Sequence, residues 1–328
     1  MNDMMNRDGV REIAIFTDIH GLLEPLEAIL NDAKRRGITE VYSLGDNIGL
    51  GPNPYEVISS ILQNQVVSVL GNYEEMLIHG PEMFQSYLTK EKIQDGFYTR
   101  ECLTKEQLQQ IESWPHFLSL HTSHHHLAFV HFANDVRIDF LYHNSYKYMD
   151  RVQSGKSGYP QFSYTNSKSQ LLYLARKLGM NVMDLKKCYT SDDCLFKIRE
   201  FLFENREFLM QNPTLRGYLS SILQPLFYEN NELKTVYDYD YILQGHTHFE
   251  VLEKNQNTTF YAIRGAALGF DREDPIEQAR YLILTVEKEH ITFESVEVPY
   301  DREKMIYSIL HAKKPNQLIR KYTKLPPR

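Results

Sequence analysis

Five apolar segments of this 328-residue chain each end in polar residues of the kinds that bind metal ions. The residues that follow them are 17–21 (TDIHG), 45–47 (GDN), 71–74 (GNYE), 131 (H) and 245–248 (GHTH). In open α/β sheets, ligands bind beyond the carboxyl ends of the strands. If the apolar segments are strands of such a fold, five separated parts of the chain bring their polar side chains to one place.

The first third of the chain predicts alternating strands and helices. Residues 13–16 form a continuous apolar run, which is typical of a strand covered on both faces. Residues 41–44 and 66–70 predict two further strands. Helical spacing in residues 22–33, and a helix opened by Pro54 and running to about residue 63, separate these strands. Strands separated by helices predict a parallel sheet.

The rest of the chain predicts two hairpins and, between them, a long helical insertion. Residues 117–121 and 126–130 form one hairpin, 241–244 resume the sheet, and 281–286 with 291–298 form a second hairpin. A final helix begins near Asp301, which is a good N-cap residue. Between the hairpins, a Tyr/Ser/Gly-rich stretch and helical patterns in residues 141–236 predict an inserted helical lobe. The lobe is either a lid over a site or a decoration or dimer surface.

We therefore predict a discontinuous core, residues 1–140 and 237–300, interrupted by the lobe at 141–236. A C-terminal helix and a basic tail follow in residues 301–328.

Composition narrows the classes of partner. The formal net charge of −7 disfavours long nucleic acid, whose neutralisation needs clustered Lys and Arg. No run of about 18 apolar residues predicts a membrane span, and the polar N-terminus does not resemble a signal peptide. Three cysteines (Cys102, Cys188 and Cys194) without CxxC spacing favour a reducing compartment. We expect a cytoplasmic protein acting on a small molecule, and homo-oligomerisation stays open.

The polar residues have the chemistry of divalent-metal ligands. Carboxylate, imidazole and amide oxygen suit Mn, Fe, Zn or Ni rather than the metals that prefer thiolates. Two such ions about 3.5–4 Å apart clamp the attacking and leaving oxygens of a phosphoryl group. Without metal, burying these groups together carries a substantial desolvation cost. The flanking glycines permit close backbone approach to a ligand.

The polar motifs follow one order along the chain: Asp18-x-His20, Gly45-Asp46, Gly71-Asn72-x-Glu74, an isolated His131 and Gly245-His246-x-His248. In this order they resemble the signature of the calcineurin-like metallophosphoesterases, over about residues 12–135 and 238–298. Residues 43–52 and 71–75 further resemble small bacterial phosphoesterases related to diadenosine tetraphosphatases. The fold that we expect is an α/β sandwich of two mixed sheets flanked by helices, interrupted here by the helical cap.

The resemblance implies a role for each ligand. Asp18, His20 and His248 hold a first metal; Asn72, His131 and His246 hold a second; Asp46 bridges both. A metal-bound hydroxide then attacks phosphorus, and no protein nucleophile is needed. The candidate catalytic residues are Asp46, Asn72, Tyr73 and Glu74, and the cofactors are two divalent ions, Mn, Fe, Zn or Ni.

Tyr73 departs from the family pattern. The third motif usually has a histidine here, which is thought to stabilise or protonate the leaving oxygen. A phenol, with a reference pKa of about 10, is a poorer proton donor at neutral pH than an imidazolium. We therefore expect Tyr73 to contact substrate and to favour anhydrides or activated esters over protein phosphoserine.

Residues 263–267 (IRGAA) replace the Asn-Pro-Gly-Ser that relatives often carry. Arg264 could bind a substrate phosphate in a bidentate manner, or it could pair with Asp271 or Glu273. Residues 124–126, three consecutive histidines, lie at a predicted hairpin turn. A surface turn is favoured there over a third metal site.

Together these patterns predict two-metal-dependent hydrolysis of a phosphoester or phosphoanhydride bond, with a small nucleotide or dinucleoside polyphosphate as the favoured substrate. One alternative is a serine/threonine-type protein phosphatase or general phosphomonoesterase. The alternative of another class is a catalytically impaired, metal-dependent binding or regulatory module, which only Tyr73 favours.

Overall fold

The computed structural model describes residues 10–81, 90–115, 117–131, 228–229, 232–233, 239–248, 250–255, 258–268 and 277–312. The chain divides into two compact units, residues 1–132 with 239–328, and residues 133–238. In the second unit, a short antiparallel pair is described, β6 (Tyr228–Glu229) and β7 (Glu232–Leu233). The rest of the predicted helical lobe lies outside the described residues, so its helical character stays a prediction.

The first sheet of the first unit contains the three parallel strands expected from the N-terminal third. Its order is β12-β11-β1-β2-β3, with β1 parallel to β2 and β2 parallel to β3. Strand β11 is antiparallel to both β1 and β12, which makes the sheet mixed. The strands are β1 (Arg11–Phe16), β2 (Glu40–Ser43), β3 (Val67–Ser68), β11 (Gln278–Val286) and β12 (Ile291–Pro299).

The second sheet has the order β4-β5-β8-β10-β9 and is also mixed. Strands β5, β8 and β10 are parallel, whereas β4 and β9 are antiparallel to their neighbours. The strands are β4 (Phe117–His121), β5 (His126–Val130), β8 (Tyr241–Gln244), β9 (Val251–Asn255) and β10 (Thr258–Ala262). The first three have the predicted bounds, and the β9–β10 hairpin was not predicted.

Alternation along β1 explains why this strand is apolar throughout. Ile13 and Ile15 pack in a core between the two sheets, with Phe129 and Leu243 of the second sheet. Ala14 and Phe16 point to the other face, where the helices pack. The predicted class, an α/β sandwich of two mixed sheets with helices, is confirmed.

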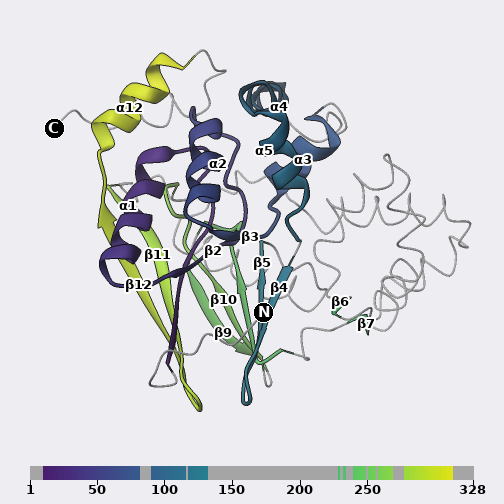
Figure 1. Ribbon diagram of the computed structural model, residues 1–328, viewed down its shortest axis with the longest axis vertical. Helices are drawn as coiled ribbons and strands as arrows, with labels where there is room; N and C mark the ends of the chain where they lie inside the picture. Colours follow the sequence, from purple (N-terminus) through teal and green to yellow (C-terminus); the bar gives the residue numbers. More distant parts are fainter. Residues whose placement is uncertain are drawn as a thin grey trace, which may run out of the picture. The chain divides into compact units, whose positions relative to one another are not determined.

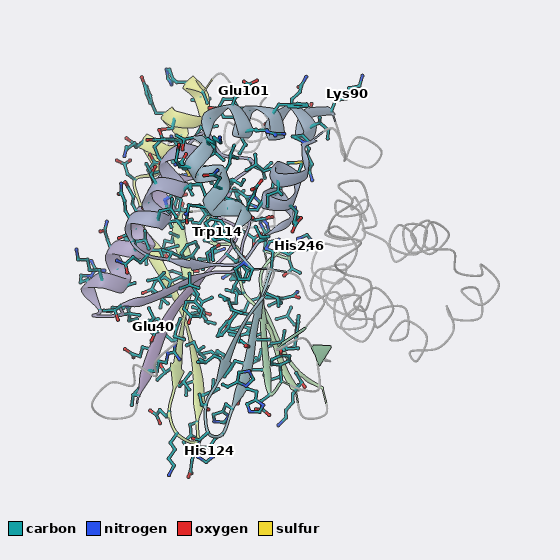
Figure 2. The ribbon with its side chains drawn as sticks, turned by 45° about the vertical axis from the view of Figure 1, so that its right-hand side comes forward. Glu40, Lys90, Glu101, Trp114, His124 and His246 are labelled. Carbon is teal, nitrogen blue, oxygen red and sulfur yellow. The ribbon has the colours of Figure 1, made fainter. Side chains whose placement is uncertain are left out.

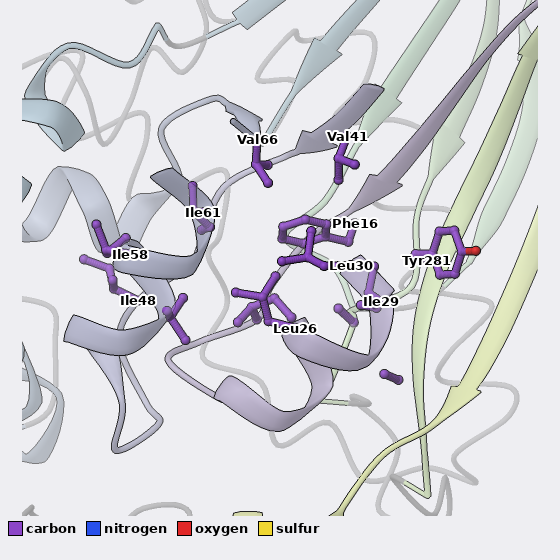
Figure 3. Close-up of a cluster of buried hydrophobic side chains, with 14 of the residues drawn as sticks. Phe16, Leu26, Ile29, Leu30, Val41, Ile48, Ile58, Ile61, Val66 and Tyr281 are labelled. Carbon is purple, nitrogen blue, oxygen red and sulfur yellow. The ribbon is translucent and has the colours of Figure 1, made fainter. Parts of the chain in front are cut away.

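The helical side of the first sheet is covered by amphipathic helices (Figure 1). Leu26, Ile29 and Leu30 of α1 pack beside Phe16, and Ile58 and Ile61 of α2 extend the same cluster (Figure 3). Pro54 opens α2 and Asp301 caps α12, as predicted. The helices are α1 (Leu23–Arg35), α2 (Pro54–Gln63), α3 (Asn72–His79), α4 (Lys90–Cys102), α5 (Lys105–Glu112) and α12 (Arg302–His311).

Strand direction decides where the polar motifs meet. The last residues of β1 and β2 are paired, Phe16 with Ser43, and those of β5 and β8 are paired, Val130 with Gln244. Each motif follows directly, so the motifs leave both sheets at the carboxyl ends of parallel strands. Among the helices that the structure describes, none is both long and apolar enough to cross a membrane.

Candidate metal centre

Two groups of potential metal ligands lie at these strand ends. The first is Asp18, His20 and His248, and the second is Asp46, His131 and His246; within each group the ligand atoms lie within 4.8 Å of one another. Figure 2 labels His246, which reaches the centre from the end of β8. All seven residues predicted as ligands therefore lie in this region, since Asn72 joins the second group through its amide oxygen.

The first group brings together oxygen and nitrogen atoms whose lone pairs can bind a cation. The Nε2 atoms of His20 and His248 are 3.2 Å apart. Asp18 Oδ1 lies 3.7 Å from His20 Nε2 and 3.1 Å from His248 Nε2. This oxygen is buried and accepts no hydrogen bond from the residues that the structure describes. A buried carboxylate oxygen facing two imidazole nitrogens fits a divalent cation, because such an ion satisfies all three atoms at once.

The second group has the same character. Asn72 Oδ1 lies 3.0 Å from His131 Nε2 and 2.9 Å from His246 Nδ1, and these two nitrogens are 3.2 Å apart. Asp46 Oδ2 approaches His131 Nε2 at 3.4 Å. An amide oxygen, a carboxylate oxygen and two ring nitrogens form a donor set suited to Mn, Fe, Zn or Ni.

Asp46 faces both groups. Besides His131, its Oδ2 lies 3.9 Å from Nε2 of His20, a member of the first group. Its Oδ1 accepts the backbone N–H of Tyr73 at 2.9 Å, which fixes the carboxylate plane. This placement agrees with the bridging position that the motif resemblance implied for Asp46.

Backbone carbonyls set the tautomers of the imidazoles. Nδ1 of His131 lies 2.7 Å from the carbonyl oxygen of Leu44, and Nδ1 of His248 lies 2.7 Å from that of Leu268. A carbonyl oxygen only accepts, so each Nδ1 carries the proton. In the neutral imidazole that binds a metal, the lone pair is then on Nε2, which is the atom that faces the ligand group.

The ligand loops hold an unusual backbone conformation. Outside glycine, the left-handed region is uncommon. In the described part of the chain it is adopted by Gln65 and by five of the seven predicted ligands, with φ between 52° and 67°: Asp18, His20, Asp46, His246 and His248. Such conformations persist at sites where the surrounding structure dictates them. Here the left-handed turns bend each loop directly after its strand and aim the side chain back at the centre.

Two glycines permit the loops to interlock. A Cβ on Gly71 would lie 2.3 Å from both the backbone nitrogen and Oδ1 of Asp46. A Cβ on Gly245 would lie 1.9 Å from Oγ1 of Thr17, the hydroxyl that donates to Asp18 Oδ2 at 2.8 Å. No side chain fits at either position without displacing Asp46 or the Thr17 hydroxyl that holds Asp18.

Glu74 lies behind the ligands and holds their backbone. Its buried carboxylate accepts the N–H groups of Gly71, Asp46 and Asn47 at 2.8, 2.9 and 2.8 Å. Burial, together with the nearby charge of Asp46, raises the pKa of Glu74 to about 7. These contacts position the ligand loops, and the catalytic role expected for Glu74 stays a prediction.

Burial and charge divide the histidines into two kinds. Burial lowers the pKa of His20 to about 4 and that of His246 to about 3, so both imidazoles are neutral near pH 7. Burial acts in the same direction on His131, but the carboxylates of Asp46, Asp18 and Glu74 together outweigh it and raise its pKa to about 9. Asp18 shows the converse: burial opposes ionisation, yet His248 and its neighbours hold its pKa below the usual value. The centre therefore attracts positive charge.

Tyr73 occupies the altered position beside the first group. Its ring meets the ring of His20 edge-on, with centroids 5.0 Å apart. A Cβ on Gly49 would lie 2.4 Å from Cδ1 of the Tyr73 ring, so the ring packs directly against that glycine. The residue as a whole is 8% exposed. The backbone of Tyr73 orients Asp46, while its ring forms part of the wall of the site.

Arg264 forms an ion pair that was not anticipated. Its Nη1 lies 3.6 Å from Oε1 of Glu297 on β12, a carboxylate that also pairs with Arg280 at 3.1 Å. The alternatives considered from the sequence, Asp271 and Glu273, lie outside the described residues. Substrate contact by Arg264 stays a prediction.

The histidines of the β4–β5 hairpin lie at the far end of that hairpin from the centre. Figure 2 labels His124 at this turn and His246 at the opposite end of the strands. Thr122 Oγ1 accepts the backbone N–H groups of His124 and His125, which closes the turn. In the part of the chain that the structure describes, these histidines belong to no group of three metal ligands.

Sequence reasoning missed two polar side chains near the centre. The hydroxyl of Thr17 holds Asp18, and its place next to that ligand was the available signal. Lys92 of α4 interacts electrostatically with Asp46. No motif marks Lys92, because it lies on a helix that contributes no ligand.

Known proteins resemble the chain in sequence and in fold. A model of the calcineurin-like phosphoesterase family matches residues 11–250. An uncharacterized protein of Methanocaldococcus jannaschii is 37% identical over 103 residues, which are 31% of this chain and only 42% of that relative. The structure of a hypothetical protein from Pyrococcus horikoshii aligns with a TM-score of 0.55 and 16% identity, over 94% of this chain and 96% of that one. A metallophosphoesterase from Sphaerobacter thermophilus aligns with a TM-score of 0.48 and 18% identity, over 95% and 97%.

Proposed function

The chain belongs to the calcineurin-like phosphoesterases, a family of hydrolases, and we propose that it hydrolyses phosphoester or phosphoanhydride bonds with two divalent metal ions. The observation that carries the proposal is the pair of ligand groups with Asp46 facing both. Asp18, His20 and His248 would hold one ion, and Asn72, His131 and His246 the other. The ions, when bound, would activate a water molecule and neutralise the phosphoryl oxygens.

The protein's own groups serve that chemistry by orientation. The left-handed loops and the carbonyls of Leu44 and Leu268 fix the ligand atoms before any substrate arrives. Preorganised groups of this kind stabilise charge in the transition state without having to reorganise. The hydroxyl of Thr17 adjoins the first group but donates to Asp18, which the proposal assigns to a metal and which is therefore no free base. Direct attack by water is the pathway that we propose.

The substrate class that we propose is a small nucleotide, with dinucleoside polyphosphates favoured. Tyr73 supports this choice, because a phenol gives little help to a leaving group that must be protonated. A departing nucleotide or phosphate is already a stable anion, whereas a serine alkoxide is not. The buried ring of Tyr73 beside His20 leaves this acid position filled by a weak acid.

A substrate panel on manganese-loaded protein tests the proposal. It contains diadenosine tetraphosphate, a cyclic dinucleotide, 4-nitrophenyl phosphate and a phosphoserine peptide. We expect fast turnover of the polyphosphate and slow turnover of the phosphoserine peptide, and no turnover of either by Asp46→Asn protein. The reverse order of substrates would indicate a protein phosphatase or general phosphomonoesterase. Equal phosphate release by wild type and Asp46→Asn would point to a contaminant and favour a metal-dependent binding module.

A further inference from the structure

The residue that follows Asp46, Asn47, has an amide side chain that lies wholly inside the protein. Asn47 is fully buried, and so are the two serines that its amide contacts, Ser43 and Ser68. Burying an amide costs free energy unless its donor and acceptor groups find partners. A buried polar network whose members are satisfied makes the structure around it rigid. The amide of Asn47 therefore fixes the position of the chain at this point.

Two hydrogen bonds anchor this amide to the ends of two parallel strands. Ser43, the last residue of β2, donates its hydroxyl to Oδ1 of Asn47 at 2.5 Å. Nδ2 of Asn47 donates to Oγ of Ser68, the last residue of β3, at 3.0 Å. The two serines are direct partners in the β2–β3 register. The amide thus closes the end of this strand pair and holds the loop that contains Asp46 against it.

The backbone of Asn47 joins the same loop to the two neighbouring ligand loops. Its carbonyl oxygen accepts the N–H of Gly21, in the first ligand loop (17–21), at 2.7 Å. Its N–H donates to the carboxylate of Glu74, in the third ligand loop (71–74), at 2.8 Å. Asn47 is therefore connected to all three loops: its backbone binds the first and the third, and its side chain anchors the second.

The position of this loop decides how Asp46 faces the two ligand groups. Oδ2 of Asp46 lies 3.9 Å from Nε2 of His20 in the first group and 3.4 Å from Nε2 of His131 in the second. A carboxylate oxygen that serves two ions tolerates little displacement, because a shift toward one group lengthens its distance to the other. Asn47 is covalently bonded to Asp46, so release of the anchored amide would let the carboxylate move.

We propose that Asn47 is a positioning residue, which sets the separation of the two metal ions by holding Asp46 between the ligand groups. The inference rests on the proposed two-metal hydrolysis and names the residue on which its bridging geometry depends. Asn47 binds neither metal nor substrate and acts through Asp46. Its loss leaves the other ligands of each group in place, so binding of the pair of ions should suffer more than binding of a single ion.

Manganese binding to Asn47→Ala provides the first measurement. Residues that orient metal ligands commonly change metal affinity by about 10–100-fold. Titration calorimetry should therefore show the second equivalent of Mn²⁺ weakened by about tenfold or more, and the first by less than about threefold. Ser68→Ala removes the partner of Nδ2 alone, so it should weaken the second equivalent in the same direction by a smaller factor.

Electron paramagnetic resonance provides the second measurement, because it distinguishes a coupled pair of Mn²⁺ ions from isolated ions. With two equivalents of Mn²⁺, the wild type should give the spectrum of a coupled pair. Asn47→Ala should give mainly the spectrum of isolated ions, since the carboxylate no longer lies between them. A residue that only stabilised the fold would leave this spectrum unchanged.

Gln107→Ala is the matched control. Gln107 is also a buried amide, and its Nε2 donates to the carbonyl oxygen of Tyr55 and to Oγ of Ser59, both at 3.0 Å. The helices that it joins, α5 and α2, carry no predicted ligand. Gln107→Ala should lower the urea midpoint of metal-free protein, as Asn47→Ala does, and should keep the manganese affinities and the spectrum of the wild type.

The outcomes separate this assignment from the proposed function. A coupled spectrum and wild-type affinities in folded Asn47→Ala would overturn the assignment, and so would equal metal losses in Gln107→Ala. If Asn47→Ala does not fold, Ser68→Ala decides: an unchanged second affinity and spectrum there would overturn it. A wild type without a coupled pair would also overturn it. If Asn47→Ala loses a coupled pair that the wild type forms, but the wild type hydrolyses no substrate of the panel, the proposed hydrolysis fails and the assignment of Asn47 stands.

Discussion

The carboxylate of Glu74 accepts the backbone N–H of Asp46 at 2.9 Å, and so joins the third ligand loop to the second. The same carboxylate holds Asn47 and Gly71. Asp46 in turn accepts the backbone N–H of Tyr73, next to Glu74. The two loops thus fix each other reciprocally, and these hydrogen bonds hold Asp46 in place without help from a metal.

Replacing Glu74 by alanine should destabilise the fold and loosen the metal centre together. Three buried N–H groups lose their acceptor, and each costs about 1–3 kcal/mol when unsatisfied. Glu74→Gln keeps one acceptor oxygen and should show a smaller loss. Urea unfolding of metal-free protein measures the stability, and titration calorimetry with Mn²⁺ measures the affinity. Unchanged manganese affinity in the folded alanine variant would refute the positioning role.

The two ligand groups should lose metal independently. His248→Ala removes a ligand of the first group and His131→Ala a ligand of the second, so each variant should retain about one equivalent of metal where wild type binds two. His124→Ala, at the exposed hairpin turn, is the control and should bind as wild type does. Elemental analysis by mass spectrometry after dialysis gives the counts. Loss of both equivalents from each single variant would show one coupled site instead.

Gly71→Ala should abolish metal binding for a steric reason alone. The backbone of Gly71 is extended, with φ −98°, so alanine is conformationally acceptable there. Its Cβ, however, would overlap the nitrogen and Oδ1 of Asp46. Gly37→Ala is the inverse case: φ is 81°, but nothing lies within 4 Å of the added Cβ. That control should lose about 1–2 kcal/mol of stability and keep full activity. A fully active Gly71→Ala enzyme would contradict the interlocked geometry.

The centre was predictable because its information is local in sequence. Each predicted ligand follows an apolar strand within a few residues. Parallel pairing alone brings the carboxyl ends of these strands to the same edge of the sheet. Pro54 and Asp301 marked helix starts for the same reason, since their effect on the backbone is confined to one turn.

The features that escaped prediction depend on contacts between distant segments. The β9–β10 hairpin was missed because its sequence shows only an ordinary alternation of polar and apolar residues, without a recognised turn motif between the strands. The ion pair of Arg264 with Glu297 joins residues from different parts of the fold, and the nearby Asp271 and Glu273 looked like better partners in the sequence. Helix α4 approaches α3 closely at Gly96, which carries no side chain. Spacing within one segment does not encode such relationships.

The ionised carboxylate of Asp32 should stabilise the folded protein at any pH above the ordinary pKa of an aspartate. Burial opposes ionisation of Asp32, but hydrogen bonds from Tyr281, Arg36 and Arg35 outweigh it and lower its pKa. A lowered folded-state pKa gives stability that is complete above the unfolded value, near 4, and is lost as the pH falls below it. Tyr281 donates to Asp32 at 2.6 Å, and a hydrogen bond to a charged group contributes about 1.5–3 kcal/mol.

We therefore expect Asp32→Asn to melt well below wild type at pH 7, with the gap narrowing from pH 4 to pH 2. Thermal melts of both proteins across this range measure the gap. Tyr281→Phe should show a smaller loss with the same pH dependence, because it removes one of the three donors to Asp32. A gap that stays constant with pH would assign the loss to packing.

Tyr73→His should broaden the enzyme toward substrates with poor leaving groups. The imidazole would replace a phenol whose ring lies against Gly49 and beside His20, and its smaller size fits the same space. General acid catalysis contributes about 10²–10⁴-fold where the leaving oxygen needs a proton, so kcat for an alkyl phosphomonoester should rise by about 10²-fold. Turnover of diadenosine tetraphosphate should hardly change, because its leaving group departs as a stable anion. Tyr73→Phe separates the two effects, since it removes the hydroxyl without adding an acid and should leave both substrates near their wild-type rates. A steep loss of polyphosphate hydrolysis in Tyr73→Phe would mean that the phenol itself acts on the substrate. The hydroxyl of Tyr73, and not the absence of a stronger acid, would then cause the preference for anhydrides.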